Sequence, residues 1–125
     1  MRLFDALSQI SEQIKQHREL MNKSEATVEQ VSVLPFVDAL GYDTKKPAEV
    51  RRQYPILNMD AVDFAILRDG EPIMFLEAKK ADENLNAKHW KQLFQYFNAD
   101  KARIGILTNG VDYRFYSDIV KPNIM

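Results

Sequence analysis

Residues 61–80 read AVDFAILRDGEPIMFLEAKK, and this stretch decides how the chain is interpreted. Two apolar runs rich in β-branched and aromatic residues surround a polar segment that contains Asp69-Gly70, a pattern typical of a β-hairpin. Each predicted strand carries one acid among apolar neighbours, Asp63 in the first and Glu77 in the second. Lys79 follows two positions after Glu77.

The pairing register of the hairpin decides whether the two acids meet. Side chains on a strand alternate between faces, so Glu77 and Lys79 point to the same side as Ile73. A longer loop that pairs Leu67 with Ile73 would place Asp63 directly opposite Glu77. In that register one edge of the sheet gathers two carboxylates and an ammonium group.

A second register is open to the same residues. A tight two-residue turn at Asp69-Gly70 would pair Arg68 with Glu71 and would put Asp63 on the face away from the second acid. Pro72 favours the longer loop, because it has no N–H to donate immediately after a tight turn. We therefore expect the register that brings the two acids together.

Two carboxylates on neighbouring strands repel each other, and apolar surroundings increase the cost. A divalent cation between Asp63 and Glu77 would remove the repulsion, and hard oxygen ligands suit Mg²⁺ or Mn²⁺. Lys79 could orient or deprotonate a water molecule, or stabilise negative charge that develops during a reaction. These are the groups needed to hydrolyse a phosphodiester bond.

The composition limits the other possibilities. A chain of 125 residues with 46% apolar residues supports one domain with a hydrophobic core. The absence of cysteine excludes disulfides, a thiolate nucleophile and cysteine-bound zinc. A net charge of −1 argues against general polyanion binding, so nucleic-acid contacts need a local basic patch. The candidates are Lys45, Lys46, Arg51, Arg52, Lys79, Lys80, Lys88 and Lys91.

Other function classes lack their signatures. The chain has no Gly-x-Ser-x-Gly elbow and no glycine-rich phosphate loop, which excludes the usual serine hydrolases and nucleotide triphosphatases. His17 and His89 have no partner histidine at metal-ligand spacing, so we interpret both as surface residues. No apolar run has the length of a signal peptide or a membrane span, and we expect a cytoplasmic protein without membrane contact.

Periodicity and turn signals predict the remaining elements. Before the hairpin we expect a helix over 3–22, a helix from Ser24 to Gly41 bent at Pro35, and a short edge strand over 50–54. After the hairpin we expect a helix that is capped by Asn84 or Asn86 and ends near Asp100. A strand over 104–108, an Asn109-Gly110 type I′ turn and a strand over 111–116 complete the order. The sum is an α/β fold, α-α-β-β-β-α-β-β, in which a mixed sheet is flanked by helices.

The chain also resembles a known nuclease group. Val62-Asp63 followed by Glu77-Ala78-Lys79 is similar to the signature of the PD-(D/E)xK nuclease superfamily, with Val62 in place of the frequent proline. Further motifs in matching order resemble the N-terminal nuclease domain of type I restriction endonuclease R subunits. They are SEATVE at 24–29, LPF at 34–36, ALGYD at 39–43, VDFAIL at 62–67, QLFQY at 92–96, TNG at 108–110 and YRFY at 113–116.

This resemblance covers roughly residues 24–119 and implies a restriction-endonuclease-like core. It divides the chain into an N-terminal helix over 1–23, a nuclease-like domain over 24–119 and a tail over 120–125. Chains of the family usually continue beyond this point, so we expect the tail to be truncated. The implied activity is Mg²⁺-dependent (or Mn²⁺-dependent) hydrolysis of DNA in restriction–modification and phage defence.

The resemblance also assigns roles to residues. Asp63, Glu77, Lys79, Gln92 and Tyr96 are implied as catalytic, and the metal is implied to bind Asp63, Glu77, the backbone carbonyl of Ala78 and Glu29. Gln92 and Tyr96 lie four positions apart on one helix face, from which they could bind a phosphate or position the nucleophile. The implied partners are DNA and a motor or specificity subunit.

Two rival hypotheses remain open from the sequence. One keeps the fold without the activity, as a nucleic-acid-binding or protein-binding module of a phage or mobile element. The other is a structural subunit that forms homo-oligomers through residues 3–22. The presence of all three residues of the signature favours an active nuclease. The sequence leaves open whether the substrate is DNA or RNA, its strandedness and its base specificity.

Overall fold

The computed structural model describes residues 2–99 and 102–117. Its centre is a five-stranded sheet in which the strands follow chain order, β1-β2-β3-β4-β5. The strands are β1 (Val50–Tyr54), β2 (Val62–Arg68), β3 (Glu71–Ala78), β4 (Ile104–Thr108) and β5 (Tyr113–Ser117). Neighbouring strands pair antiparallel except β3 and β4, which are parallel. The predicted α/β class, the mixed sheet and the order of elements are confirmed.

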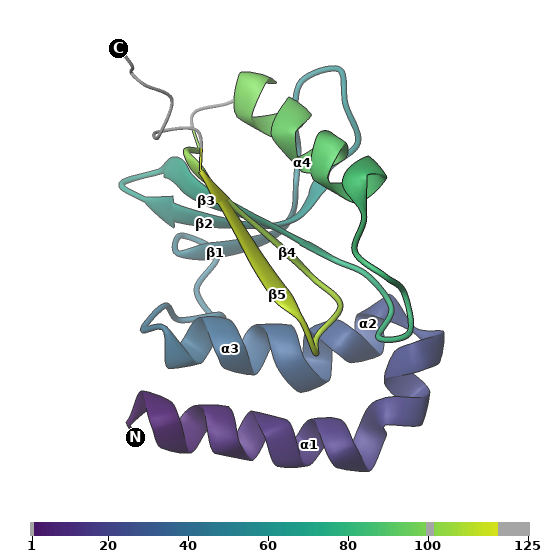
Figure 1. The fold of residues 1–125 in the computed structure, drawn as a ribbon. Coiled ribbons are helices and arrows are strands. Elements are labelled where there is room, and N and C mark those ends of the chain that lie inside the picture. The colour runs from purple at the N-terminus through teal and green to yellow at the C-terminus, as the bar shows by residue number, and fades with distance from the viewer. Residues whose placement is uncertain (1, 100–101, 118–125) are drawn as a thin grey trace.

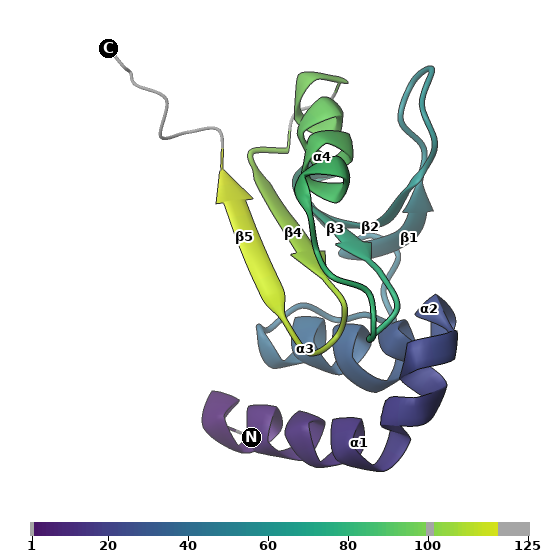
Figure 2. The same ribbon diagram turned by 45° about the vertical axis from the view of Figure 1, so that its right-hand side comes forward.

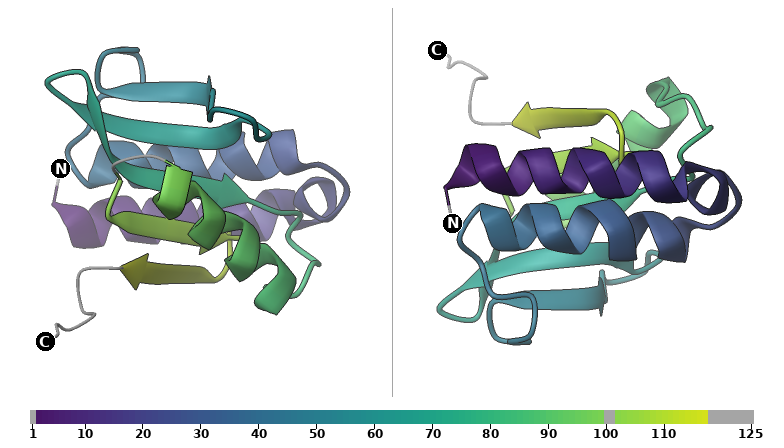
Figure 3. Two further views of the ribbon diagram at one scale, coloured as in Figure 1. Left: turned by 90° about the horizontal axis from the view of Figure 1, so that it is seen from above. Right: turned by 90° about the horizontal axis from the view of Figure 1, so that it is seen from below.

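Helices cover both faces of the sheet (Figure 1). They are α1 (Leu3–Lys23), α2 (Glu25–Val28), η1 (Glu29–Val33), α3 (Leu34–Ala39) and α4 (Ala87–Ala99). The helix α4 connects β3 to β4 and lies on one face, whereas α1 to α3 lie on the other. Seen from below, α1 and α3 run side by side (Figure 3).

The predicted second helix is divided into α2, η1 and α3. Ser24 caps it as expected, because its hydroxyl oxygen accepts a hydrogen bond from the Thr27 N–H at 3.2 Å. The middle turn, η1, is a wide π-turn that ends immediately before α3, whose first turn holds Pro35. Pro35 therefore occupies a position where its missing N–H costs little. Gly41, with φ of +104°, follows the end of the helix.

Two apolar clusters fill the two faces of the sheet. The cluster beneath α1 to α3 includes Met21, Val28, Val33, Phe64, Ile66, Leu76 and Ile106. The cluster beneath α4 includes Ala65, Phe75, Leu93, Tyr96 and Leu107. Because alternate strand residues share a face, Asp63 lies on the same side as Ala65, and Glu77 on the same side as Phe75. The side that carries both acids is therefore the one covered by α4.

The hairpin has the expected register at the two acids, but its turn differs from the predicted one. The turn at Asp69-Gly70 is tight and pairs Arg68 with Glu71, so the predicted longer loop is wrong. Both turn residues have positive φ, +53° and +79°, as a tight turn requires. Leu67 then pairs with Pro72 instead of Ile73, whereas Ile66 pairs with Met74.

Ile73 is consequently an extra residue in β3, a β-bulge between the pairs Leu67–Pro72 and Ile66–Met74. Ile73 and Met74 both pack on the cluster beneath α1 to α3, so the predicted common face of Ile73 and Glu77 is wrong. Beyond the bulge Phe64 pairs with Leu76, which aligns the next positions, Asp63 and Glu77. The bulge thus reconciles a tight turn with the register that the site requires.

The connection from β4 to β5 also differs from its prediction. Thr108 pairs with Tyr113, so the loop has four residues and β5 begins at Tyr113, two residues later than predicted. At the other junction, Asn86 is the cap of α4, because its side-chain oxygen accepts hydrogen bonds from Lys88 N–H and His89 N–H at 3.0 and 3.3 Å.

Candidate functional site

Asp63 and Glu77 are held together by reciprocal bonds between β2 and β3. The Asp63 N–H donates to Glu77 Oε1 at 2.8 Å, and the Ala78 N–H donates to Asp63 Oδ2 at 2.8 Å. Glu77 is buried, with 5% of its surface exposed, and Asp63 is partly buried. Each acid is therefore fixed by the backbone of the strand that carries the other.

This arrangement perturbs both carboxyl groups in the same direction. Burial and the nearby charge of Asp63 raise the pKa of Glu77 to about 8. Burial also raises the pKa of Asp63, although hydrogen bonds from Ala78 and Gln53 and the charges of Lys79 and Arg52 oppose the rise. Two neighbouring acids, one buried and one partly buried, whose pKa values are both raised form a site that would gain from a cation.

Lys79 lies at the same end of the sheet as the two acids. Its backbone N–H donates to the Thr108 carbonyl at 2.8 Å, which ties the end of β3 to the end of β4. Its positive charge lowers the pKa values of both Asp63 and Glu77, so it acts on both carboxylates. The structure therefore brings together the three groups of the sequence motif.

Glu29 approaches the pair from the first position of η1. It is buried, and burial followed by the charge of Asp63 raises its pKa. Its carboxylate forms an ion pair with the guanidinium of Arg52, which lies on the edge strand β1. From the sequence, Arg52 was predicted only as a candidate for DNA contact. No sequence motif indicated its ion pair with Glu29.

Gln92 and Tyr96 lie on α4 above the pair. Gln92 Nε2 donates to the Tyr96 hydroxyl at 3.1 Å, and the Tyr96 ring packs edge-on against Phe75. Burial and then the charge of Glu77 raise the pKa of Tyr96 to about 12, so its hydroxyl keeps its proton at neutral pH. A polar hollow of about 610 Å³ adjoins Gln92; it is lined by Asn58, Met59, Asp60, Gln92 and Gln95.

The donor set fits a hard divalent cation. The reciprocal bonds use Oδ2 of Asp63 and Oε1 of Glu77, and each carboxylate keeps further lone pairs for an ion. Oxygen ligands from carboxylates suit Mg²⁺ and Mn²⁺. Within residues 2–99 and 102–117, no three histidine, cysteine or carboxylate side chains converge as a ready-made metal cluster. Glu29 is close enough for its charge and that of Asp63 to interact, but its carboxylate is paired with Arg52.

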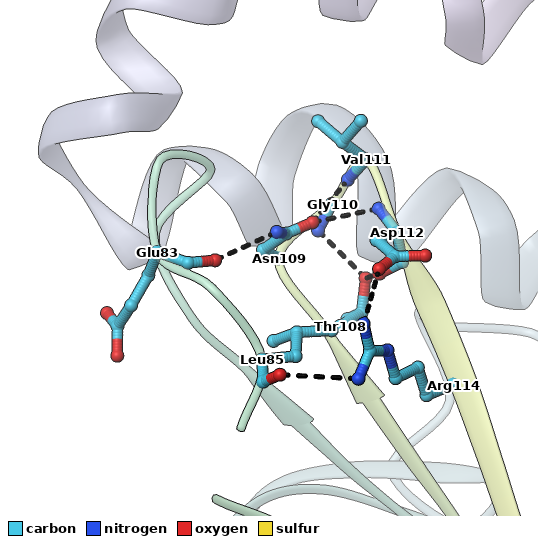
Figure 4. Close-up of polar contacts among 8 residues, drawn as sticks. All are labelled: Glu83, Leu85, Thr108, Asn109, Gly110, Val111, Asp112 and Arg114. Carbon is cyan, nitrogen blue, oxygen red and sulfur yellow. Dashed lines mark hydrogen bonds and ion pairs between the residues drawn. The ribbon is translucent and has the colours of Figure 1, made fainter.

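The loop from Asn109 to Asp112 braces the chain that follows Lys79 (Figure 4). Asn109 Oδ1 accepts hydrogen bonds from the Val111 and Asp112 N–H groups, and its Nδ2 donates to the Glu83 carbonyl at 3.0 Å. Arg114 donates to the Leu85 carbonyl at 3.3 Å. The segment between β3 and α4 is therefore attached to the β4–β5 loop.

The same loop is seated on the N-terminal helices. Ser32 Oγ donates to the Gly110 carbonyl at 2.7 Å and lies 2.7 Å from the Tyr113 hydroxyl. On the neighbouring segment, the Ala81 N–H donates to the Met21 carbonyl at 3.0 Å. The sequence showed only an Asn-Gly turn signal here, and no pattern indicated these long-range bonds.

Seven of the eight predicted DNA-contact cations are exposed, and the exception is the partly buried Lys79. They are distributed over the chain before β1, β1 itself, the end of β3 and α4. Their contact with nucleic acid stays a prediction. In the part of the chain that the structure describes, no helix combines the length and apolar character needed to cross a bilayer.

Comparison with known proteins gives one family. A family model described as the type I restriction enzyme R protein N terminus matches residues 49–124, more than half of the chain. The match includes the hairpin, α4 and the β4–β5 pair, and it begins after the segment that carries Glu29. Neither the curated proteins nor the solved structures with which the chain was compared gave a match.

Proposed function

The chain belongs to the family of type I restriction enzyme R protein N-terminal domains, and on that premise we propose that it is a Mg²⁺-dependent nuclease that hydrolyses DNA. The observation that carries the proposal is the reciprocally bonded pair of Asp63 and Glu77 with Lys79 beside it. A purely structural role gives no reason to bury two neighbouring acids, because their repulsion opposes folding.

Each residue of the site has a proposed role. Asp63, Glu77 and the Ala78 carbonyl hold the divalent ion, and Glu29 assists, either through water or after release from Arg52. When bound, the ion supplies a Lewis acid that activates water and neutralises charge on the phosphate. Lys79 orients the attacking water and stabilises the negative charge that develops on the phosphate oxygens.

Gln92 and Tyr96 have a supporting role in the proposal. The protonated Tyr96 hydroxyl and the Gln92 amide can both donate hydrogen bonds to a phosphate, because neither is negatively charged at neutral pH. The polar hollow beside Gln92 has room for the strand that carries this phosphate. Membership of the R protein family favours DNA as the substrate and a motor or specificity subunit as the partner.

Cleavage and metal binding by the full chain test the proposal. Supercoiled plasmid and single-stranded oligonucleotides are incubated with Mg²⁺ or Mn²⁺, and the parent is compared with Glu77→Gln and Lys79→Ala. Each variant should cut at least about 100-fold more slowly. Glu19→Gln, at an exposed position on α1, is the matched control and should cut like the parent.

Metal binding is measured separately by calorimetric titration with Mn²⁺. The parent should bind the ion and Asp63→Ala should not. The nuclease proposal is wrong if Glu77→Gln and Lys79→Ala cut as well as the parent. If the parent binds DNA but neither binds Mn²⁺ nor cleaves, the chain is the inactive binding module of the rival hypothesis.

A further inference from the structure

Gln53, the residue before the last of β1, has an unusual backbone conformation. Its φ is +51°, in the left-handed region that residues with a Cβ rarely adopt. Two other non-glycine residues among those described have positive φ, Asn58 and Asp69. Asparagine and aspartate tolerate this conformation, because their short polar side chains bond locally. Glutamine is not of that kind, so Gln53 needs another explanation.

The position of Gln53 in the sheet supplies one. In the ladder between β1 and β2, Arg52 pairs with Phe64 and Tyr54 pairs with Val62. Gln53 therefore stands across from Asp63. Its side-chain amide reaches the Asp63 carboxyl group, and this hydrogen-bonding contact lowers the pKa of Asp63, as a donor to a carboxylate does. The strained residue and the acid of the site are thus direct partners.

Packing does not account for the strain. Gln53 is exposed, so no buried apolar contact of its side chain forces the backbone into this conformation. Local strain persists where surrounding interactions over-determine it, and it concentrates at functional sites. The partner that is found for Gln53 is the carboxylate that also accepts the Ala78 N–H. Two donors from two different strands therefore fix the orientation of Asp63.

We propose that Gln53 is a positioning residue of this site: its left-handed backbone holds its amide on Asp63 and so fixes the orientation in which that carboxylate binds a divalent cation. The inference rests on the proposed metal centre and extends it to the edge strand β1. Partners that orient a metal ligand typically change metal affinity by about 10- to 100-fold when they are removed. Gln53 does not itself touch the ion or the substrate.

Two substitutions separate positioning from a merely structural role. Gln53→Gly removes the amide and relieves the left-handed strain, so its Tm should equal or exceed that of the parent. Gln53→Ala has the same backbone strain as the parent but loses the contact of the amide with Asp63, so its Tm should fall. Calorimetric titration of the full chain with Mn²⁺, well below the lowest Tm, should give a Kd at least about 10-fold weaker for both variants.

Asp69→Gly is the matched control. It relieves the same backbone conformation at the other end of β2, in the hairpin turn, and should leave the Kd for Mn²⁺ unchanged. The inference is overturned if the two Gln53 variants bind Mn²⁺ within twofold of the parent. It is also overturned if only the variant with the lower Tm binds Mn²⁺ more weakly and the variant with the higher Tm binds it as tightly as the parent. That pattern would mean that affinity reflects stability alone.

The same titration distinguishes this inference from the proposed function. If the parent binds Mn²⁺, Asp63→Ala does not, and the Gln53 variants equal the parent, the metal centre stands and the role of Gln53 is wrong. If the parent itself does not bind Mn²⁺, the metal centre is wrong and the role of Gln53 falls with it. If both Gln53 variants bind Mn²⁺ more weakly, while the Tm of Gln53→Ala falls and that of Gln53→Gly does not, the result supports the metal centre and the role of Gln53.

Discussion

The two ends of the central sheet are built for different purposes. At one end Asp69-Gly70 closes the β2–β3 hairpin in open surroundings, and a Cβ on Gly70 would meet nothing within 4 Å. At the other end β3 and β4 finish beside the two acids and close to the N-terminal helices, which lie below the sheet in Figure 2. The turn end only has to reverse the chain. The site end combines two neighbouring acids with raised pKa values, a strained residue and a tightly packed loop, which are costs that proteins accept at functional sites.

Substitution of one glycine at each end should give the largest contrast in stability. A Cβ on Gly110 would lie 2.8 Å from Val28 Cγ1 and 2.9 Å from Met21 Cε, and φ there is +88°. Gly110→Ala should therefore lower the free energy of unfolding by about 3–4 kcal/mol, from overpacking and backbone strain together.

Gly70→Ala is the matched substitution at the turn end and should cost only about 1 kcal/mol, for its positive φ of +79°. Urea denaturation followed by circular dichroism measures both values. Equal losses for the two variants would show that the contacts of Gly110 with Val28 and Met21 do not constrain the loop.

The next contrast concerns pH and the buried charge at the site end. Because the pKa of Glu77 is raised to about 8 from an ordinary 4.5, the unfolded chain releases this proton at lower pH than the folded one. Without metal, the free energy of unfolding should therefore be highest below pH 4.5 as far as this group is concerned and should fall as pH rises towards 8.

Glu77→Gln should flatten this pH dependence and should be more stable than the parent at pH 8 without metal, by a few kcal/mol at about 1.4 kcal/mol per pKa unit. The amide oxygen can still accept the Asp63 N–H. Thermal melts in a chelator between pH 5 and 8.5 measure the effect, with Glu19→Gln as an exposed control. A parent whose stability does not change over this range would contradict the prediction.

A smaller effect is expected when the bulge is removed. Deletion of Ile73 leaves Leu67 paired with Pro72 and Ile66 paired with Met74 as consecutive steps of a regular hairpin. The pairing beyond it, and hence the bonds between Asp63 and Glu77, should persist. We expect a loss of about 1–2 kcal/mol from the missing side chain.

The Mn²⁺ affinity of the Ile73 deletion should stay within about threefold of the parent. Urea denaturation measures the loss of stability, and calorimetric titration measures the affinity for Mn²⁺. Loss of metal binding in a folded deletion variant would mean that the bulge holds the site end in shape, and the two ends would then not be independent.

The sequence predicted what local pattern and spacing determine. Alternation over 64–67 and, beyond the bulge, over 74–77, the helical face of Gln92 and Tyr96 and the Ser24 cap are all properties of neighbouring residues, and the structure has them. The alignment of Asp63 with Glu77 was also expected. It was expected for the wrong reason, because Pro72 was taken to prevent the tight turn that the structure contains.

What the sequence did not predict depends on contacts between distant segments. The bulge at Ile73 is favoured by packing beneath α1 to α3, which no local signal reports. Asn109-Gly110 resembles a two-residue turn, but the Asn109 side chain bonds Val111 and Asp112 and so closes a four-residue loop. The roles of Arg52 and Gln53 follow from the pairing of β1, a strand with little pattern of its own.

The two crossed bonds between Asp63 and Glu77 have a consequence for folding. A slip of β3 by a single residue would break both bonds at once and would carry one acid to the opposite face of the sheet. The same contacts that hold the two acids together therefore favour the correct alignment of the strands. A misaligned chain therefore loses the pairing of the two acids and their polar cross-links together.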